Sequence, residues 1–288
     1  MLLSTGMVPR ARRATPDHLV GVAKAADELG YHCLWFGDRT VYAVDYESGG
    51  PDHKEGLPWD ISAQQNEGIV NLSWVLANTT RLRAGVSVMI IPLRNPVVLA
   101  RQVATVDYLS KGRLNFGIGV GGIPEEFAAV NVPWARRGAR ADEYIAAMKT
   151  LWGPDPKPKF SGEFISFPEV YCNPKPAQEG GPPLYIGGHS DAAYRRVGRY
   201  ADAWAAGRGR PDYIAETMVK IRAYAEAAGR DPASIKVMCT TWQVAAEDTR
   251  RRLAELEEAG VDEVVVPVEG RELSEVRDYL AKTQELLA

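Results

Sequence analysis

The sequence contains few cysteines and few histidines. Its three cysteines, Cys33, Cys172 and Cys239, lie far apart in the chain, and its four histidines form no H-x-x-x-H pair. No Cys-x-x-Cys pair is present either, so the spacing typical of zinc sites is missing. We therefore expect buried, unpaired thiols and no metal centre.

Long apolar runs and a basic stripe are also missing. No uninterrupted apolar stretch approaches the roughly 18 residues of a membrane span. The N-terminal segment MLLSTGMVPRARR lacks the charged-then-apolar order of a signal peptide. The net charge is −3, from 34 Lys and Arg against 37 Asp and Glu, and the densest basic run, ARRGAR at 135–140, is short. The sequence thus predicts a cytoplasmic protein with no membrane and no nucleic-acid partner.

What the sequence does have is a regular alternation of strand-like and helix-like segments. Its 288 residues are 45% hydrophobic and 25% charged, which suits a globular protein with a large core. Thr15 and Pro16 mark the start of the first expected helix and Gly30 its end, and Asn95, Pro96 and Gly112 frame the third in the same way. Eight strand–helix pairs result. The expected strands are residues 2–7, 32–38, 81–91, 113–121, 183–188, 202–207, 235–245 and 261–268, and the expected helices are 15–30, 61–78, 95–112, 139–152, 190–201, 211–229, 249–260 and 272–287.

Residues 153–182 break this alternation. They are rich in proline and carry the alternating stretch KFSGEFISFPEVYCNP, which predicts a hairpin inserted between the fourth helix and the fifth strand. Eight pairs of this size favour a (β/α)8 TIM barrel, an α/β fold, formed as one domain by residues 1–288. The competing open sheet would need G-x-G-x-x-G directly after its first strand, where this sequence has STGMVPRARR.

In such a barrel the reacting groups follow the C-terminal ends of the strands. The junction after the fifth strand, PLYIGGHSDAAYRR, places Gly187 and Gly188 before Ser190, which can cap the next helix. Bare backbone at a helix N-terminus can hold a phosphate, and it can equally form an ordinary tight turn. Its place on the expected active face favours a ligand site.

Four segments, in this order, resemble the luciferase-like monooxygenase superfamily, and most of all its branch that uses the deazaflavin coenzyme F420. They are LGYHCLWFGDR, AGVSVMIIPLRNPVVLARQVATVDYLSKGRLNFGIGVGG, EEFAAVNVPWARRGARADEYIAAMKTLW and PLYIGGHSDAAYRRVGRYADAW. The resemblance covers nearly the whole chain. It implies a barrel that is usually dimeric, with the cofactor ring in the barrel mouth and F420, or alternatively FMN, as cofactor. It also implies that Gly187, Gly188, His189 and Ser190 hold the cofactor phosphate.

The resemblance further implies a bulged third strand with a non-proline cis peptide at Ser87–Val88, placed against one face of the ring. Ser87 and the backbone of Gly119 and Gly121 offer hydrogen bonds to a ring of this kind. An apolar wall would come from the second to fourth strands, although the same side chains could equally belong to the barrel core. These candidates are Trp35, Phe36, Val88, Ile90 and Phe116.

Candidate catalytic groups follow the second and fourth strands. The family commonly has Asp followed by His where this sequence has Asp38 and Arg39, and an arginine cannot shuttle protons at neutral pH. Either no such histidine is needed, or Arg39 binds an anionic group of substrate or cofactor. A salt bridge from Arg39 to Asp38 or Glu125 is the alternative. Glu125 and Glu126 follow the fourth strand, where the family often has a carboxylate near the ring, and Glu125 is the catalytic candidate. Either glutamate could instead be a helix-start residue that interacts with the helix dipole.

The loop after the second strand, residues 42–59, contains Tyr42, Tyr46, His53 and Trp59. We expect these side chains to close over an apolar or aromatic substrate, unless they are incidental residues of a surface loop. Three functions remain open. The favoured one is an F420-dependent oxidoreductase that transfers a hydride to or from a small organic substrate. We expect such an enzyme to form a homodimer, as the resemblance implies. The alternatives are an FMN-dependent monooxygenase supplied by a reductase, and a catalytically silent cofactor-binding barrel.

Overall fold

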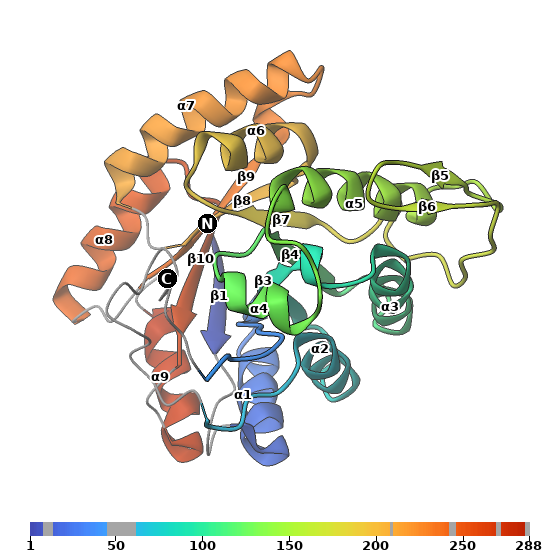
Figure 1. Cartoon of the computed structure of the whole chain (residues 1–288). Helices are drawn as coiled ribbons and strands as arrows, with labels where there is room; N and C mark the ends of the chain where they lie inside the picture. The colour runs from blue at the N-terminus through green and yellow to red at the C-terminus, as the bar shows by residue number, and fades with distance from the viewer. Residues whose placement is uncertain (8–13, 45–61, 208–209, 242–245, 269–271, 286–288) are drawn as a thin grey trace.

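Eight strands lie side by side, all parallel, and close into a barrel in the order β1-β10-β9-β8-β7-β4-β3-β2 (Figure 1). The computed structural model describes residues 1–7, 14–44, 62–207, 210–241, 246–268 and 272–285. The predicted (β/α)8 barrel is confirmed. The barrel strands are β1 (Leu2–Met7), β2 (Cys33–Phe36), β3 (Arg83–Ile90), β4 (Leu114–Gly119), β7 (Leu184–Gly187), β8 (Ala203–Gly207), β9 (Lys236–Thr240) and β10 (Glu263–Pro267).

A helix follows each barrel strand, and the predicted caps are present. The Thr15 side chain accepts a hydrogen bond from the N–H of His18, and Asn95 accepts from Val97 and Val98. None of the described helices is long and apolar enough to cross a membrane. The helices are α1 (Pro16–Glu28), α2 (Gly68–Ala77), α3 (Pro96–Leu109), α5 (Arg137–Trp152), α6 (Asp191–Tyr200), α7 (Pro211–Ala227), α8 (Ala246–Glu258) and α9 (Leu273–Glu285).

Two helix predictions need correction. The second helix was expected from residue 61 but begins at Gly68, because Glu67 caps it by accepting from the N–H of Val70. The segment after β4 forms a separate short helix, α4 (Pro124–Ala129), and two short 3-10 helices occur at Ile91–Leu93 and Pro232–Ser234. Residues 242–245, the end of the expected seventh strand, lie outside the described residues.

The inserted hairpin is present as β5 (Phe160–Ser161) and β6 (Ser166–Phe167), which pair antiparallel. Its turn is fastened to α5 through the carboxylate of Glu143, which accepts hydrogen bonds from the backbone N–H groups of Glu163, Phe164 and Ile165. The hairpin therefore lies outside the barrel, against the helical ring (Figure 1).

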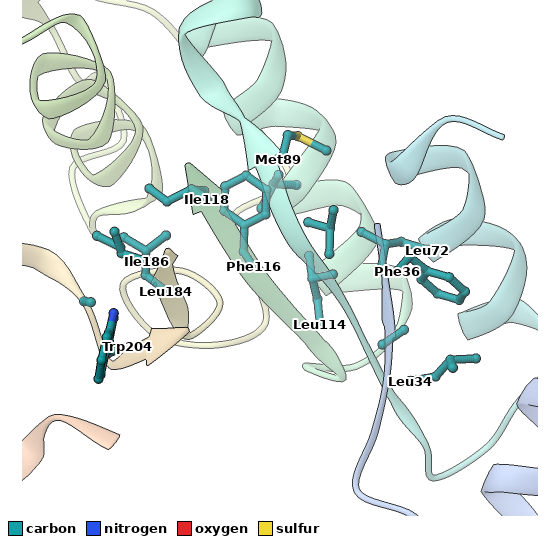
Figure 2. Packing of buried hydrophobic residues seen from close by; sticks show 14 of the residues in the cluster. Leu34, Phe36, Leu72, Met89, Leu114, Phe116, Ile118, Leu184, Ile186 and Trp204 are labelled. Carbon is teal, nitrogen blue, oxygen red and sulfur yellow. The ribbon is translucent and has the colours of Figure 1, made fainter. Parts of the chain in front are cut away.

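Alternate strand residues face two different cores. One buried cluster joins residues of strands on opposite sides of the ring and so fills the barrel interior; its members are Cys33, Trp35, Tyr185, Ala203, Ala205, Met238 and Val265. The larger cluster lies between the barrel and the helices and contains Phe36 and Phe116 (Figure 2). Phe36 and Phe116 are therefore core residues and form no wall of the barrel mouth. All three cysteines are buried, and none of them forms a disulfide bond within the described part of the chain.

Below the mouth, the barrel interior is closed by a buried carboxylate. Glu263 is 2% exposed. It accepts hydrogen bonds from Trp35 Nε1 at 2.7 Å and Tyr185 OH at 3.0 Å, and from the Ser4 hydroxyl. A Cβ on Gly85 would lie 2.4 Å from the Trp35 ring, so the glycine makes room for the indole. Glu263 is the first residue of β10, so this buried cluster lies at the end of the barrel where the strands begin.

Candidate functional site

The third strand is bulged at the mouth. Val86 of β3 is paired with Phe116 of β4, but Met89 is paired with Ile118, so β3 carries one extra residue over this stretch. The peptide bond between Ser87 and Val88 is cis. Both features were predicted for this strand and are confirmed.

The bulge places the Val88 side chain against two glycines, Gly119 of β4 and Gly187 of β7. A Cβ on Gly119 would lie 2.7 Å from Val88 Cγ2, and a Cβ on Gly187 would lie 3.2 Å from Val88 Cγ1. The Val88 side chain also packs against the interior cluster around Trp35. Val88 therefore forms the apolar floor of the mouth, between the ends of β4 and β7. Gly121, with φ +82°, follows in the loop after β4.

The loop after β7 offers hydrogen-bond donors to an anion. Ser190 caps α6 by accepting from the N–H of Ala193. Among the described residues, none accepts a hydrogen bond from the backbone N–H of His189, Ser190 or Asp191. Free N–H groups at a helix start favour a phosphate or carboxylate. The Asp191 carboxylate itself is paired with Arg195 at 2.6 Å, which offsets its repulsion of an anion.

Aromatic side chains from three elements hold this loop in place. Trp204 Nε1 of β8 donates to the carbonyl of Gly188 at 3.2 Å, and Tyr194 OH of α6 donates to the carbonyl of His189 at 3.0 Å. Tyr213 OH of α7 lies 3.2 Å from His189 Nδ1 and 2.5 Å from Tyr194 OH. Burial, and then the neighbouring Tyr213 hydroxyl, raise the pKa of Tyr194 to about 12. Sequence reasoning missed these supports, because no spacing links three separate elements.

Asp38 has a contact for each carboxylate oxygen. Its side chain is 1% exposed. Oδ1 accepts from the N–H of Gly68 at the start of α2 at 3.0 Å, and Oδ2 accepts from Arg94 Nη2 at 2.8 Å. Arg94 also pairs with Glu67 at 2.9 Å. These contacts give Asp38 a role in positioning α2 and the segment after β3, and leave it poorly suited to proton transfer.

Arg39 pairs with Glu126, not with Asp38 or Glu125 as the alternative interpretation expected. Arg39 Nη1 lies 3.0 Å from Glu126 Oε2, and the Glu126 side chain is 1% exposed. Burial raises the pKa of Glu126, and the contact with Arg39 lowers it. The negative charges of Asp38 and Glu125 raise it further, so that the pKa of Glu126 lies above its ordinary value. Glu125 is half-buried in the first turn of α4. No sequence signal separates two adjacent glutamates, and the sequence analysis chose Glu125 rather than Glu126 as the catalytic candidate.

The predicted substrate loop is described only at its start. Tyr42 OH donates to Gln65 Oε1 at 2.8 Å, and the Arg39 guanidinium carbon lies 5.8 Å from the centre of the Tyr42 ring. Tyr42 is therefore close to Arg39, whereas Tyr46, His53 and Trp59 lie outside the described residues. Within the described part of the chain, no group of three or more His, Cys, Asp or Glu side chains could hold a metal ion.

Comparison with known proteins agrees with this geometry. The chain is 32% identical over 255 residues to an uncharacterised protein of Mycobacterium tuberculosis, covering 86% of this chain and 83% of the relative. It is 29% identical over 239 residues to the F420-dependent glucose-6-phosphate dehydrogenase of Kineococcus radiotolerans, covering 81% and 65%.

Solved structures share the fold over the full length. An F420-dependent secondary alcohol dehydrogenase in complex with an F420-acetone adduct matches with a TM-score of 0.81 at 16% identity, covering 100% of this chain and 99% of the other. The monooxygenase RslO1 from Streptomyces bottropensis matches with a TM-score of 0.76 at 20% identity, covering 100% and 98%. The model of the luciferase-like monooxygenase family matches residues 2–286. This chain therefore belongs to the luciferase-like monooxygenase family.

Proposed function

We propose that this protein is an oxidoreductase that transfers a hydride between coenzyme F420 and a small organic substrate. The observation that carries the proposal is the loop after β7, where the N–H groups of His189, Ser190 and Asp191 have no acceptor among the described residues and suit a cofactor phosphate. The F420-dependent relative supports the choice of the deazaflavin. When bound, the deazaflavin would supply the hydride-accepting ring carbon.

Different residues of the barrel mouth would bind different parts of such a cofactor. The loop at Gly187, Gly188, His189 and Ser190 would bind the phosphate. The floor formed by Val88 would exclude water from one face of a flat ring. Ser87 and the backbone at Gly119 and Gly121 would supply hydrogen bonds to the polar ring edge.

Charged residues of the rim would serve the substrate. Arg39 and Glu126, with Glu125 beside them, lie after β2 and β4 and next to the start of the loop that contains Tyr42. Asp38 would act as a positioning residue through Arg94 and α2. A flavin monooxygenase would use the same barrel, and the similarity to RslO1 keeps that function as the second candidate.

The cofactor assignment predicts a difference in affinity. F420 is expected to bind at least about tenfold more tightly than FMN, a gap of about 1.4 kcal/mol. Quenching of tryptophan fluorescence, titrated with each cofactor, measures both dissociation constants. Oxidation of the reduced cofactor is then followed with and without oxygen. Equal affinities, or turnover that requires oxygen and reduced FMN, would assign the protein to the monooxygenase class.

We also propose that the protein forms a homodimer through the outer faces of α2 and α3. Large apolar side chains are exposed there, including Trp74 of α2 at 50%, and Val98 and Leu109 of α3 at 57% and 72%. Tyr171, which follows the hairpin, is 72% exposed and borders the same surface, with Val98 and Leu109, around a 610 Å³ groove. Contiguous exposed apolar surface is typical of an interface between subunits.

Negative charge introduced on this surface by mutation is expected to separate the subunits. The double variant Val98→Glu, Leu109→Glu should shift the protein from dimer to monomer in light scattering after size exclusion, because two buried carboxylates would face their symmetry mates. Val219→Glu is the matched control, since Val219 is 69% exposed on α7, on another side of the barrel (Figure 1). A monomeric wild type, or an equal effect of the control, would rule out this interface.

A further inference from the structure

The ion pair between Arg39 and Glu126 is incomplete on the glutamate side. Oε2 contacts Arg39, but Oε1 is buried and has no hydrogen-bond partner among the described residues. A buried carboxylate is stable only when it is paired and its oxygens accept hydrogen bonds. The negative charge of Glu126 therefore depends on a single contact.

The surrounding charges make the contact with Arg39 important for the protonation state of Glu126. Within the described part of the chain, the other charged groups that act on Glu126 are Asp38, after β2, and Glu125, on α4, and both are negative. Arg94 lies nearby but is engaged by Asp38 and Glu67. Together with burial, the two carboxylates favour the protonated form of Glu126, while Arg39 opposes it.

Arg39 is the accessible member of the pair. Its side chain is 24% exposed against 1% for Glu126. A guanidinium binds carboxylate and phosphate groups well, because its N–H donors form a fork that matches two oxygens. An anion that draws Arg39 away would leave Glu126 as a buried, unpaired carboxylate, which then takes up a proton.

We propose that Arg39 and Glu126 form a proton-coupled site for an oxyanion of the substrate, a carboxylate or phosphate, with one proton taken up by Glu126 for each anion bound. The assignment of the anion to the substrate rests on the proposed function, in which the cofactor phosphate binds after β7. Strands β3 and β4 separate β2, which precedes Arg39, from β7. By linkage, the affinity for the anion falls as pH rises above the pKa of Glu126.

Calorimetric titration of the cofactor-free protein with sulfate tests the coupling, because sulfate keeps its charge across the range used. Titrations at pH 6 and pH 8, each in two buffers of different ionisation enthalpy, report the dissociation constant and the protons taken up. For the wild type we expect proton uptake that depends on Arg39. Because one proton per anion changes the dissociation constant about tenfold per pH unit, binding should be about a hundredfold weaker at pH 8 than at pH 6.

Four variants separate the contributions of Arg39 and Glu126 to sulfate binding and proton uptake. Glu126→Gln should bind sulfate without Arg39-dependent proton uptake and with little dependence on pH. The control Glu216→Gln, at an exposed position of α7, should behave like the wild type. Arg39→Gln should lose the coupled component and retain only sulfate bound by the loop after β7. Arg39→Lys keeps the charge and should restore weaker, still coupled binding. Thermal melting of each variant checks that it is folded.

Wild-type binding that does not change with pH, or equal proton uptake by wild type and Glu126→Gln, would overturn the coupling. Repeating the titration with saturating F420 tests the source of the anion: persistence of the coupled sulfate binding supports the substrate. If F420 itself drives the Arg39-dependent uptake and blocks sulfate, the oxyanion belongs to the cofactor and the assignment is wrong. Failure of F420 to bind would contradict the proposed function, while the sulfate titration would still decide the coupling.

Discussion

Replacement of Gly188 by valine is expected to weaken F420 binding by about a hundredfold or more, a loss of about 2.7 kcal/mol. Gly188 has φ +130°, which β-branched residues strongly disfavour, and its Cβ would lie 2.7 Å from the Cβ of Ala193. The loop would have to move, and with it the N–H groups of His189 and Ser190 that suit a phosphate. Fluorescence titration of the variant and the wild type measures the change.

A matched control separates the effect on F420 binding from the effect of backbone strain at a positive φ. Gly229, at the end of α7, also has a positive φ of +72°, but a Cβ there would have nothing within 4 Å. Gly229→Val should therefore carry a similar backbone cost, about 1–2 kcal/mol of stability, and leave F420 binding unchanged. A folded Gly188→Val variant that binds F420 with wild-type affinity would show that the loop is only a turn.

Replacement of Gly117 by alanine is expected to damage both stability and cofactor binding. A Cβ on Gly117 would lie 2.1 Å from the carbonyl oxygen of Val86 and 3.2 Å from its carbonyl carbon. These are backbone atoms of β3 at the start of the bulge, so neither can rotate away. Overpacking of this kind costs about 3 kcal/mol. Urea unfolding measures the stability loss, and F420 titration measures the displacement of Ser87 and Val88.

Gly138→Ala is the control for this substitution. Its Cβ would meet only the end of the Arg196 side chain, at 3.2 Å, and alanine favours the helical conformation of α5. We expect a change in stability within about 1 kcal/mol and unchanged F420 binding. If Gly117→Ala were as stable as Gly138→Ala and bound F420 normally, the close contact between β3 and β4 would not be important for the mouth.

Short-range sequence signals predicted most of the strands and helices of the fold. The strand over residues 2–7 was predicted with the bounds that β1 has, and the caps at Thr15 and Asn95 act within three residues of themselves. The predicted start of α2 was wrong because the Glu67 cap is joined there by a distant contact, in which Asp38, 30 residues earlier, accepts a hydrogen bond from the Gly68 N–H. The stretch ISAQQNE at 61–67 is compatible with a helix, so sequence alone could not place the first turn of α2.

The mouth was predicted only in outline. The bulge at Ser87–Val88 came from the family resemblance, since a non-proline cis peptide has no local signal. The period of two along a strand indicates that Trp35 and Phe36 face opposite sides. It does not say which side is the barrel interior, and closure of the sheet places Trp35 inside and Phe36 under the helices.

The sequence by itself determined the alternation of strands and helices, the inserted hairpin and the glycines at the strand ends, because these depend on period, caps and backbone freedom within a few residues. Tertiary structure decided which charges meet. Arg39 and Glu126 are 87 residues apart, and Glu126 rather than Glu125 reaches Arg39 because adjacent residues of a helix point in different directions. The aromatic support of the loop after β7 has the same origin, since Tyr194, Trp204 and Tyr213 come together only when α6, β8 and α7 pack around it.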